Sequence, residues 1–131
     1  MFLSRLSEEQ KKAFLAIAMK IVGADHRLDM KERRTIEGMR YEMGLWTETD
    51  IPSGNIEELA QPFDTRQTQV TVMLEAIGLA YVDEEFHGEE QKILRALALT
   101  FKFSEEEATA MENWVLQLKK LQKEAETWMN K

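Results

Sequence analysis

The sequence contains no cysteine, only two histidines, and few helix breakers: two prolines and six glycines in 131 residues. Without cysteine, a disulfide scaffold, an iron–sulfur cluster, cysteine-ligated zinc and thiol catalysis are all excluded. Long apolar runs are missing too. The two longest, 13–24 and 70–82, carry Lys20 and Glu75 and are too short to cross a bilayer. We therefore expect a soluble, cytoplasmic protein with no membrane span.

Positive charge is also scarce. The chain has 17 Lys and Arg residues but 24 Asp and Glu residues, which gives a net charge of −7. This balance argues against nonspecific binding to nucleic acid, so a protein is the partner we expect. At 44% hydrophobic residues the chain is too apolar to be disordered. Its length suits one domain with a core of its own, spanning 1–131.

Helix formers and capping signals dominate the rest of the sequence, and no stretch alternates apolar and polar residues for long. We therefore predict an all-α protein. Two of the helices, around 13–24 and 70–82, are apolar nearly all round, which places them side by side at the centre. The predicted helices cover about 7–23, 29–44, 55–62, 64–81, 88–101 and 104–128.

An internal repeat is indicated when 13–45 is placed over 71–103, an offset of 58. We expect two three-helix repeats, about 8–61 and 66–129, related by pseudo-two-fold symmetry. In both copies an Asp ends the central helix, an apolar residue follows at +3 and a Glu at +7. These residues are Asp25, Leu28 and Glu32 in the first copy, and Asp83, Phe86 and Glu90 in the second. We expect both apolar residues to be buried under their loops.

The paired carboxylates suggest a cation site. An Asp just past a helix C-terminus faces carbonyls that already carry partial negative charge. In the second copy no Lys or Arg occurs between Arg66 and Lys92, although 83–90 holds five carboxylates. Oxygen clusters of this kind suit Ca²⁺, Mg²⁺ or Mn²⁺. The predicted ligands are Asp25, Glu32, Asp83 and Glu90, either as one shared site or as two separate ones.

Simpler readings of these residues remain open. Glu32 and Glu90 both fit the third position of a helix, where a capping box places a Glu without any ligand. His26 and His87, the two histidines, lie in the same loops and are either solvated or contribute to a transition-metal or pH-sensitive contact. Neither loop is an EF-hand, because Ile36 and Leu94 stand where the bidentate Glu belongs.

The pattern Ala-Asp-Gly-x-apolar-x-x-x-Glu at the end of a central helix resembles the tellurite-resistance TerB-like family. That family includes the N-terminal domain of the membrane-anchored DnaJ-like co-chaperone DjlA. The resemblance covers about 8–120 and rests on Ala24, Asp25, Leu28, Glu32, Asp83, Phe86 and Glu90. His26 and Glu84 stand where the family has Gly, which allows a positive φ at little cost.

The resemblance implies two pseudo-symmetric repeats, an acidic surface associated with cation binding, and a stress-response or interaction role without catalysis. A role in tellurite resistance itself does not follow from a domain-level match. Our favoured interpretation is a small interaction or scaffold protein that binds a divalent cation and is not an enzyme. One alternative is an ion-free acidic docking module of co-chaperone type. The other is a metal-dependent hydrolase that uses carboxylates of 83–90 for acid–base chemistry.

The last predicted helix carries an apolar seam with spacings of 3, 4, 3, 4 and 3, as in a heptad repeat. Past Lys119 this helix outruns the others, so its tail should project and offer a contact for a homodimer or another partner. The seam consists of Met111, Trp114, Leu118, Leu121, Ala125 and Trp128. Five methionines fall on core phases of their helices: Met19, Met39, Met43, Met73 and Met111.

Overall fold

The computed structural model describes residues 1–23, 30–45, 50–82 and 88–131. Within these ranges every regular element is a helix, which confirms the all-α class. The elements are η1 (Leu3–Arg5), α1 (Glu8–Val22), α2 (Met30–Met43), α3 (Ile56–Ala60), α4 (Arg66–Ala80), α5 (Gly88–Thr100) and α6 (Glu105–Met129). In the described part of the chain, no helix is both long enough and apolar enough to cross a membrane.

Capping boxes open four of these helices, and in three of them the cap is the residue at which the predicted helix begins. Ser7, Asn55 and Ser104 each accept the backbone N–H of the third helical residue, whose side chain accepts the N–H of the cap in return. The fourth box corrects the predicted start, because Thr65 and not Asp64 is the cap of α4. Each box satisfies two helix-terminal N–H groups that have no partner within the helix.

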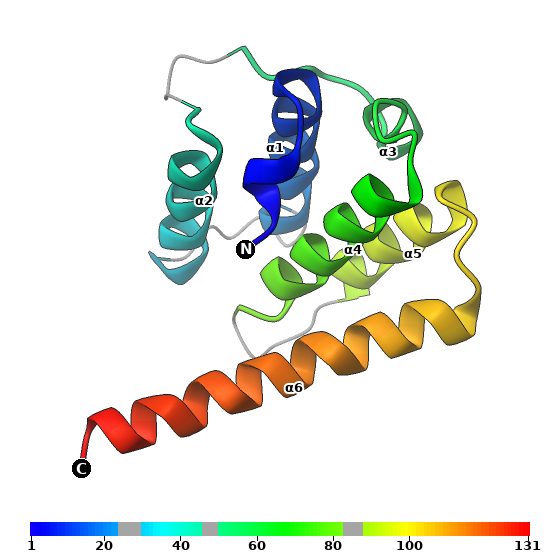
Figure 1. Ribbon diagram of the computed structural model, residues 1–131. Coiled ribbons are helices and arrows are strands. Elements are labelled where there is room, and N and C mark those ends of the chain that lie inside the picture. Colours follow the sequence, from blue (N-terminus) through cyan, green and yellow to red (C-terminus); the bar gives the residue numbers. More distant parts are fainter. Residues whose placement is uncertain (24–29, 46–49, 83–87) are drawn as a thin grey trace.

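The helices form two antiparallel hairpins, α1–α2 and α4–α5, with the short α3 between them and the long α6 lying across one side (Figure 1). α1 packs against α2, α3, α4 and α5, and α4 packs against α1, α5 and α6. The prediction that the two most apolar helices lie side by side at the centre is therefore confirmed.

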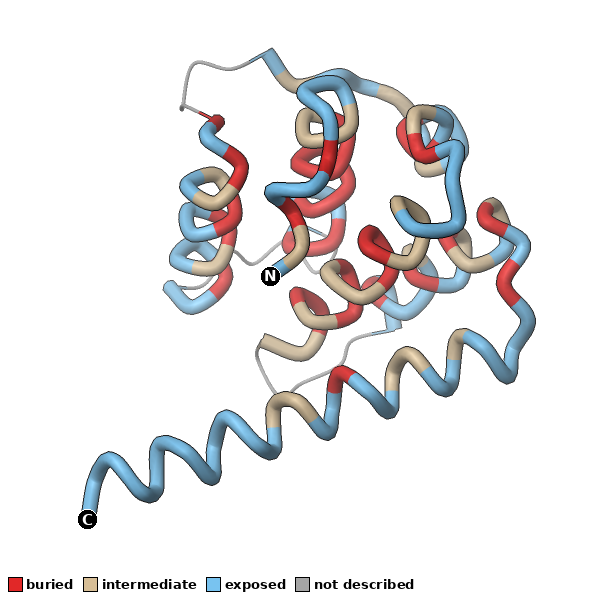
Figure 2. The backbone as a smooth tube through the Cα atoms, viewed as in Figure 1, coloured by how far each residue is buried: buried red, intermediate tan, exposed pale blue. Residues whose placement is uncertain are grey.

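The C-terminal part of α6 stands clear of the body (Figure 2). Val115 is the one residue of α6 that is buried, and every residue from 120 to 131 is exposed. The projecting tail predicted from the sequence is thus observed. The helix docks on the body through Val115, with Met111 and Leu118 half-buried beside it. The other four residues of the apolar seam are exposed.

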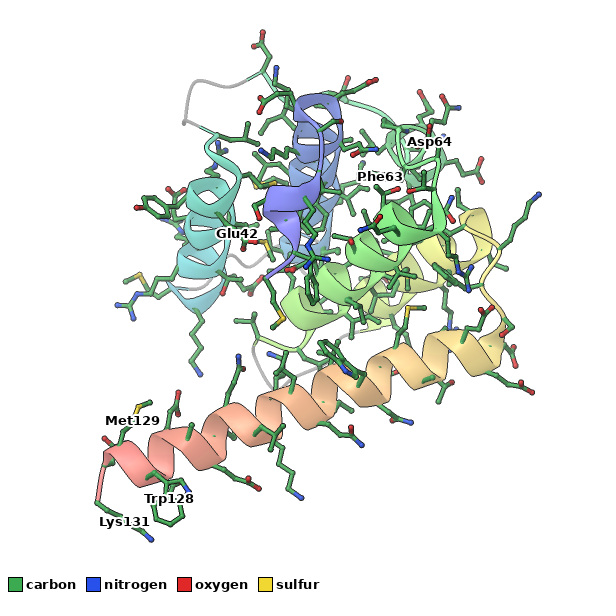
Figure 3. The ribbon with its side chains drawn as sticks, in the orientation of Figure 1. Glu42, Phe63, Asp64, Trp128, Met129 and Lys131 are labelled. Atoms are coloured by element: carbon green, nitrogen blue, oxygen red, sulfur yellow. The ribbon has the colours of Figure 1, made fainter. Side chains whose placement is uncertain are left out.

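The N-terminal segment is attached to the body by two glutamates that sequence reasoning did not single out. The Glu75 carboxylate of α4 accepts the Phe2 N–H at 2.9 Å, and the Glu42 carboxylate of α2 accepts the Leu3 N–H at 2.9 Å. Figure 3 labels Glu42 on α2. The Met1 ammonium lies 2.8 Å from Glu42 and 2.9 Å from Glu75. The segment thereby links α2 to α4, and Leu3 is completely buried.

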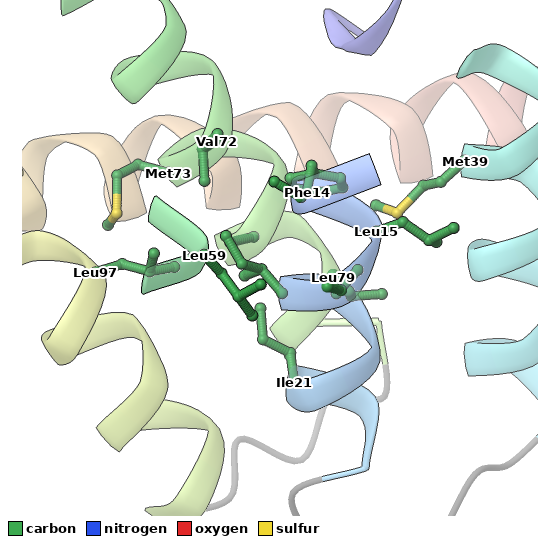
Figure 4. Packing of buried hydrophobic residues seen from close by; sticks show 14 of the residues in the cluster. Phe14, Leu15, Ile21, Met39, Leu59, Val72, Met73, Leu79 and Leu97 are labelled. Carbon is green, nitrogen blue, oxygen red and sulfur yellow. The ribbon is translucent and has the colours of Figure 1, made fainter. Parts of the chain in front are cut away.

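Large apolar side chains from both hairpins meet in one core (Figure 4). Phe14 of α1 and Leu97 of α5 are fully buried, as is Leu3. Met39, Met43 and Met73 are buried in agreement with the prediction, and Met111 is half-buried. The assignment of Met19 to the core was wrong: it lies on the one exposed strip of α1, beside Lys20.

The offset of 58 seen in the sequence recurs in the helix positions. α1 and α4 have the same length of 15 residues and begin at Glu8 and Arg66. The second helices of the hairpins begin at Met30 and Gly88. They also bury matching positions, which are Glu32, Ile36, Met39 and Met43 in the first and Glu90, Leu94, Leu97 and Phe101 in the second.

Both second helices end in the same C-cap. After α2, the Leu45 N–H donates to the Arg40 carbonyl at 2.9 Å and the Gly44 N–H to the Tyr41 carbonyl at 3.1 Å. This is a Schellman motif, in which the residue after the cap adopts a left-handed conformation. Gly44, the last residue of the predicted helix 29–44, has φ +69° and takes this left-handed position.

After α5, the equivalent bonds run from Phe103 to the Ala98 carbonyl at 2.9 Å and from Lys102 to the Leu99 carbonyl at 3.1 Å. Here the left-handed position is filled by Lys102, with φ +60°. It is the one non-glycine residue with positive φ among those described. The second hairpin thus has the same Schellman motif without the glycine that adopts a left-handed conformation at low cost.

This difference gives a stability prediction. Lys102→Gly should raise the free energy of unfolding by about 0.5–1 kcal/mol, because glycine removes the left-handed strain but gains entropy in the unfolded chain. Gly44→Ala should lower it by about 1 kcal/mol through strain alone, since an added Cβ would meet nothing within 4 Å. Urea unfolding measures both, and Lys120→Gly within α6 is the control that should destabilise. A loss of stability in Lys102→Gly would contradict the strain argument.

The exposed tail gives a second prediction. Deleting 122–131 should leave the helical domain folded, since this segment has no buried residue and surface truncation removes little core area. The measurement is a thermal unfolding curve followed by circular dichroism. Non-cooperative melting of the shortened chain would show that the tail belongs to the core.

Candidate divalent-cation site

Two of the four predicted ligands lie at the start of the hairpins' second helices. Glu32 is the third residue of α2 and Glu90 is the third residue of α5. Each side chain is only 3% exposed, and they are the two charged residues that are buried in the described ranges. The sequence therefore picked out, as a matched pair, the two carboxylates that the fold places in its interior.

Burial distinguishes Glu32 and Glu90 from the capping residues of the other helices. In the four capping boxes whose caps are described, the third helical residues are Gln10, Glu58, Thr68 and Glu107. None of them is buried, and the two glutamates among them are exposed. The capping glutamates of this protein are thus exposed to solvent, whereas the side chains of Glu32 and Glu90 are buried.

The helix dipole stabilises a carboxylate in the first turn by less than its removal from water costs. A carboxylate in the first turn of a helix gains about 0.3–1 kcal/mol from the helix dipole. Removing an ionised carboxylate from water costs several kcal/mol unless opposite charge or hydrogen bonds compensate. The burial of a glutamate at this position can be offset by hydrogen bonds, a proton, a cationic side chain or a metal ion.

The other two predicted ligands, Asp25 and Asp83, lie outside the described residues. So do His26, His87, and the predicted loop plugs Leu28 and Phe86. Within the described ranges, no three Asp, Glu or His side chains lie close enough to hold a metal ion. A site built on Glu32 and Glu90 would therefore have to draw further ligands from 24–29 and 83–87.

The helix ends that flank these two segments lie toward the same side of the molecule. α1 and α4 end, and α2 and α5 begin, on the side of the molecule where α6 runs (Figure 1). This placement is compatible with one acidic surface formed by both copies. It also places the start of α5, with Glu89 and Glu90, on the side where α6 runs, and the middle of α6 is basic.

Sequence reasoning missed a cavity of about 650 Å³ between the start of α2, the end of α4 and the middle of α6. Lysines from two helices line it, together with Tyr81, Val82, Leu116, Gln122 and Glu126. The lysines are Lys31, Lys119, Lys120 and Lys123. Three of them fall within five residues of sequence, a signal that could have been read as a basic patch on an otherwise acidic chain.

Two groups at this cavity have shifted pKa values. Burial, helped by the neighbouring Lys123 ammonium, lowers the pKa of Lys119. Burial and a hydrogen bond donated to Glu112 raise the pKa of Tyr81 to about 12. At neutral pH the tyrosine is therefore a hydrogen-bond donor, and the cavity wall is positively charged.

Comparison of this chain with models of known protein families, with curated proteins and with solved structures finds no match. The TerB-like resemblance accordingly rests on the residues that carry the repeated motif.

Proposed function

We propose that this protein is a small, non-enzymatic interaction module of the TerB-like kind, and that its two acidic loops bind a divalent cation. The observation that carries the proposal is the burial of Glu32 and Glu90 at matched positions, in contrast to the exposed capping glutamates Glu58 and Glu107. Asp25 and Asp83 would complete the ligand set, as one shared site or two. Oxygen donors of this type favour Ca²⁺, Mg²⁺ or Mn²⁺.

The proposal includes an internal duplication, with three-helix repeats at about 8–61 and 66–129 related by a pseudo-two-fold axis. Three independent features support it at the same offset of 58 residues: the helix starts, the buried positions of the second helices, and the paired Schellman motifs. Random amphipathic helices share an apolar phase, but they do not share caps and buried carboxylates as well. A duplicated fold would give each repeat the same carboxylate pair.

A cation would meet a local excess of negative charge. Five carboxylates lie within 83–90, and no Lys or Arg occurs between Arg66 and Lys92. Like charges this close raise one another's free energy, so a divalent ion that binds only the folded chain would stabilise it.

One observation favours the ion-free alternative, an acidic docking module of co-chaperone type. Lys31, Lys119 and their neighbours already place positive charge on the side where the two loops begin and end. If these ammonium groups supply the countercharge, the acidic surface needs no metal and is free to engage a basic partner segment.

Thermal unfolding with added cations separates the two. Under the cation reading, millimolar Ca²⁺, Mg²⁺ or Mn²⁺ should raise the Tm by about 5 °C at a tenfold excess over the Kd, which corresponds to about 1.4 kcal/mol. Glu32→Gln combined with Glu90→Gln should abolish the rise, because the amides keep the size but lose the charge.

Glu58→Gln is the matched control, since it changes an exposed glutamate at the same helical position. It should respond to cations like the parent. No shift of the parent Tm with any of the three ions would support the docking module instead, and an equal loss of response in Glu58→Gln would point to diffuse surface screening.

A further inference from the structure

The lysine-lined cavity between α2, α4 and α6, here called the basic cavity, adjoins a second cavity of about 240 Å³. The two share Val82, Lys119 and Gln122 in their linings, so they meet at the end of α4 and the middle of α6. The second one, here called the apolar cavity, is lined mainly by aliphatic side chains, which include Met39, Leu74, Leu79, Val115 and Leu118. One ligand could therefore place a charged end in the first cavity and an apolar end in the second.

The basic cavity is positively charged although the chain as a whole is negative. Four lysines and one glutamate, Glu126, line it, which gives a formal charge of +3. The ammonium groups of Lys31, Lys119 and Lys120 have no hydrogen-bond or salt-bridge partner among the described residues. Lys119 is half-buried, and burial together with the Lys123 ammonium disfavours its charged form. An anion bound beside Lys119 would offset this cost.

The type of cation in the basic cavity indicates which anion fits it. An ammonium group is a compact point charge that commonly binds phosphate, whereas the forked guanidinium of arginine is the usual partner of a planar carboxylate. Among the described residues that line the two cavities there is no arginine. A phosphate monoester carries a charge of about −1.5 to −2 at pH 7, which the lysines can balance.

The apolar cavity provides room for a hydrocarbon chain. Each methylene group that leaves water for such a site strengthens binding about fourfold. Gly78 of α4 lines this cavity, and a Cβ added there would meet nothing within 4 Å. Glu75, the acidic residue of the wall, lies 2.9 Å from the Met1 ammonium. Its charge is thus already balanced and does not repel an anionic ligand strongly.

We propose that the two cavities form one binding site for a single-chain amphiphile with a phosphate monoester head. The phosphate lies among Lys31, Lys119 and Lys120, and the hydrocarbon chain runs past Gly78 between α2 and α6. The ligand binds as a free monomer, because a chain enclosed between helices has left the bilayer. This site is separate from cation binding by the acidic loops, since neither Glu32 nor Glu90 lines either cavity.

Isothermal titration calorimetry of the full chain with octyl phosphate tests the site, below the micelle concentration and without divalent ions. One molecule should bind per chain, about tenfold or more tightly than inorganic phosphate, because only the octyl chain fills the apolar cavity. Octyl glucoside, which has the same chain and a neutral head, should also bind about tenfold more weakly than octyl phosphate.

Two variants separate the head from the chain. Lys119→Gln should weaken octyl phosphate about tenfold, because it removes the ammonium that borders both cavities. Lys20→Gln, which removes an exposed lysine of α1, is the matched control and should bind like the parent. Gly78→Leu should fill the apolar cavity and lower the affinity for octyl phosphate to that for inorganic phosphate. Leucine is favoured over glycine within a helix, so this variant should keep the parent's circular dichroism spectrum.

Several outcomes would overturn the proposal. Octyl phosphate that binds no more tightly than inorganic phosphate would exclude the apolar half of the site, and parental affinity in Lys119→Gln would exclude the basic half. Vesicles of phosphatidylcholine with phosphatidic acid distinguish a membrane headgroup from a free ligand. We expect no binding to these vesicles, and binding to them without binding of monomeric octyl phosphate would show that the lysines contact a membrane surface instead.

Discussion

The rest of the structure depends on the burial of α1 on nearly every side. Residues 13–18 are all buried, so this helix contacts both its own hairpin partner and the second hairpin. A helix that is apolar all round cannot be stable at a surface, and it forces the other elements to enclose it. The two hairpins, α3 and the N-terminal segment are arranged around this requirement, and α6 closes the far side of α4.

The core around α1 is almost entirely apolar. Glu32 and Glu90 are the two charged residues buried in the described part of the chain. Glu32 and Glu90 occupy the first turns of α2 and α5, where hairpin geometry turns the third residue toward the core in both copies. The capping glutamates Glu58 and Glu107 stand at the same helical position but are exposed, so burial sets Glu32 and Glu90 apart from them.

The two hairpins differ in the helix that follows each of them. The first is followed by a helix of five residues that packs into the body, whereas the second is followed by one of 25 residues in which every residue from 120 onward is exposed. Gly44 is replaced by Lys102 at the equivalent turn. The two hairpins thus share their helix starts and buried positions, while the long α6 with its exposed apolar residues and lysines has no counterpart of equal length after the first hairpin.

The sequence by itself determined the helices, because capping residues and apolar periodicity act over a few residues and need no tertiary information. It also determined which two helices are central and which positions carry the repeated carboxylates. Only the tertiary structure decided that Glu32 and Glu90 are buried, that Val115 is the docking residue of α6, and that lysines of α2 and α6 share a cavity. Burial and cavity formation depend on how helices distant in sequence pack against one another, and amphipathic periodicity fixes a helical face only to within about one residue.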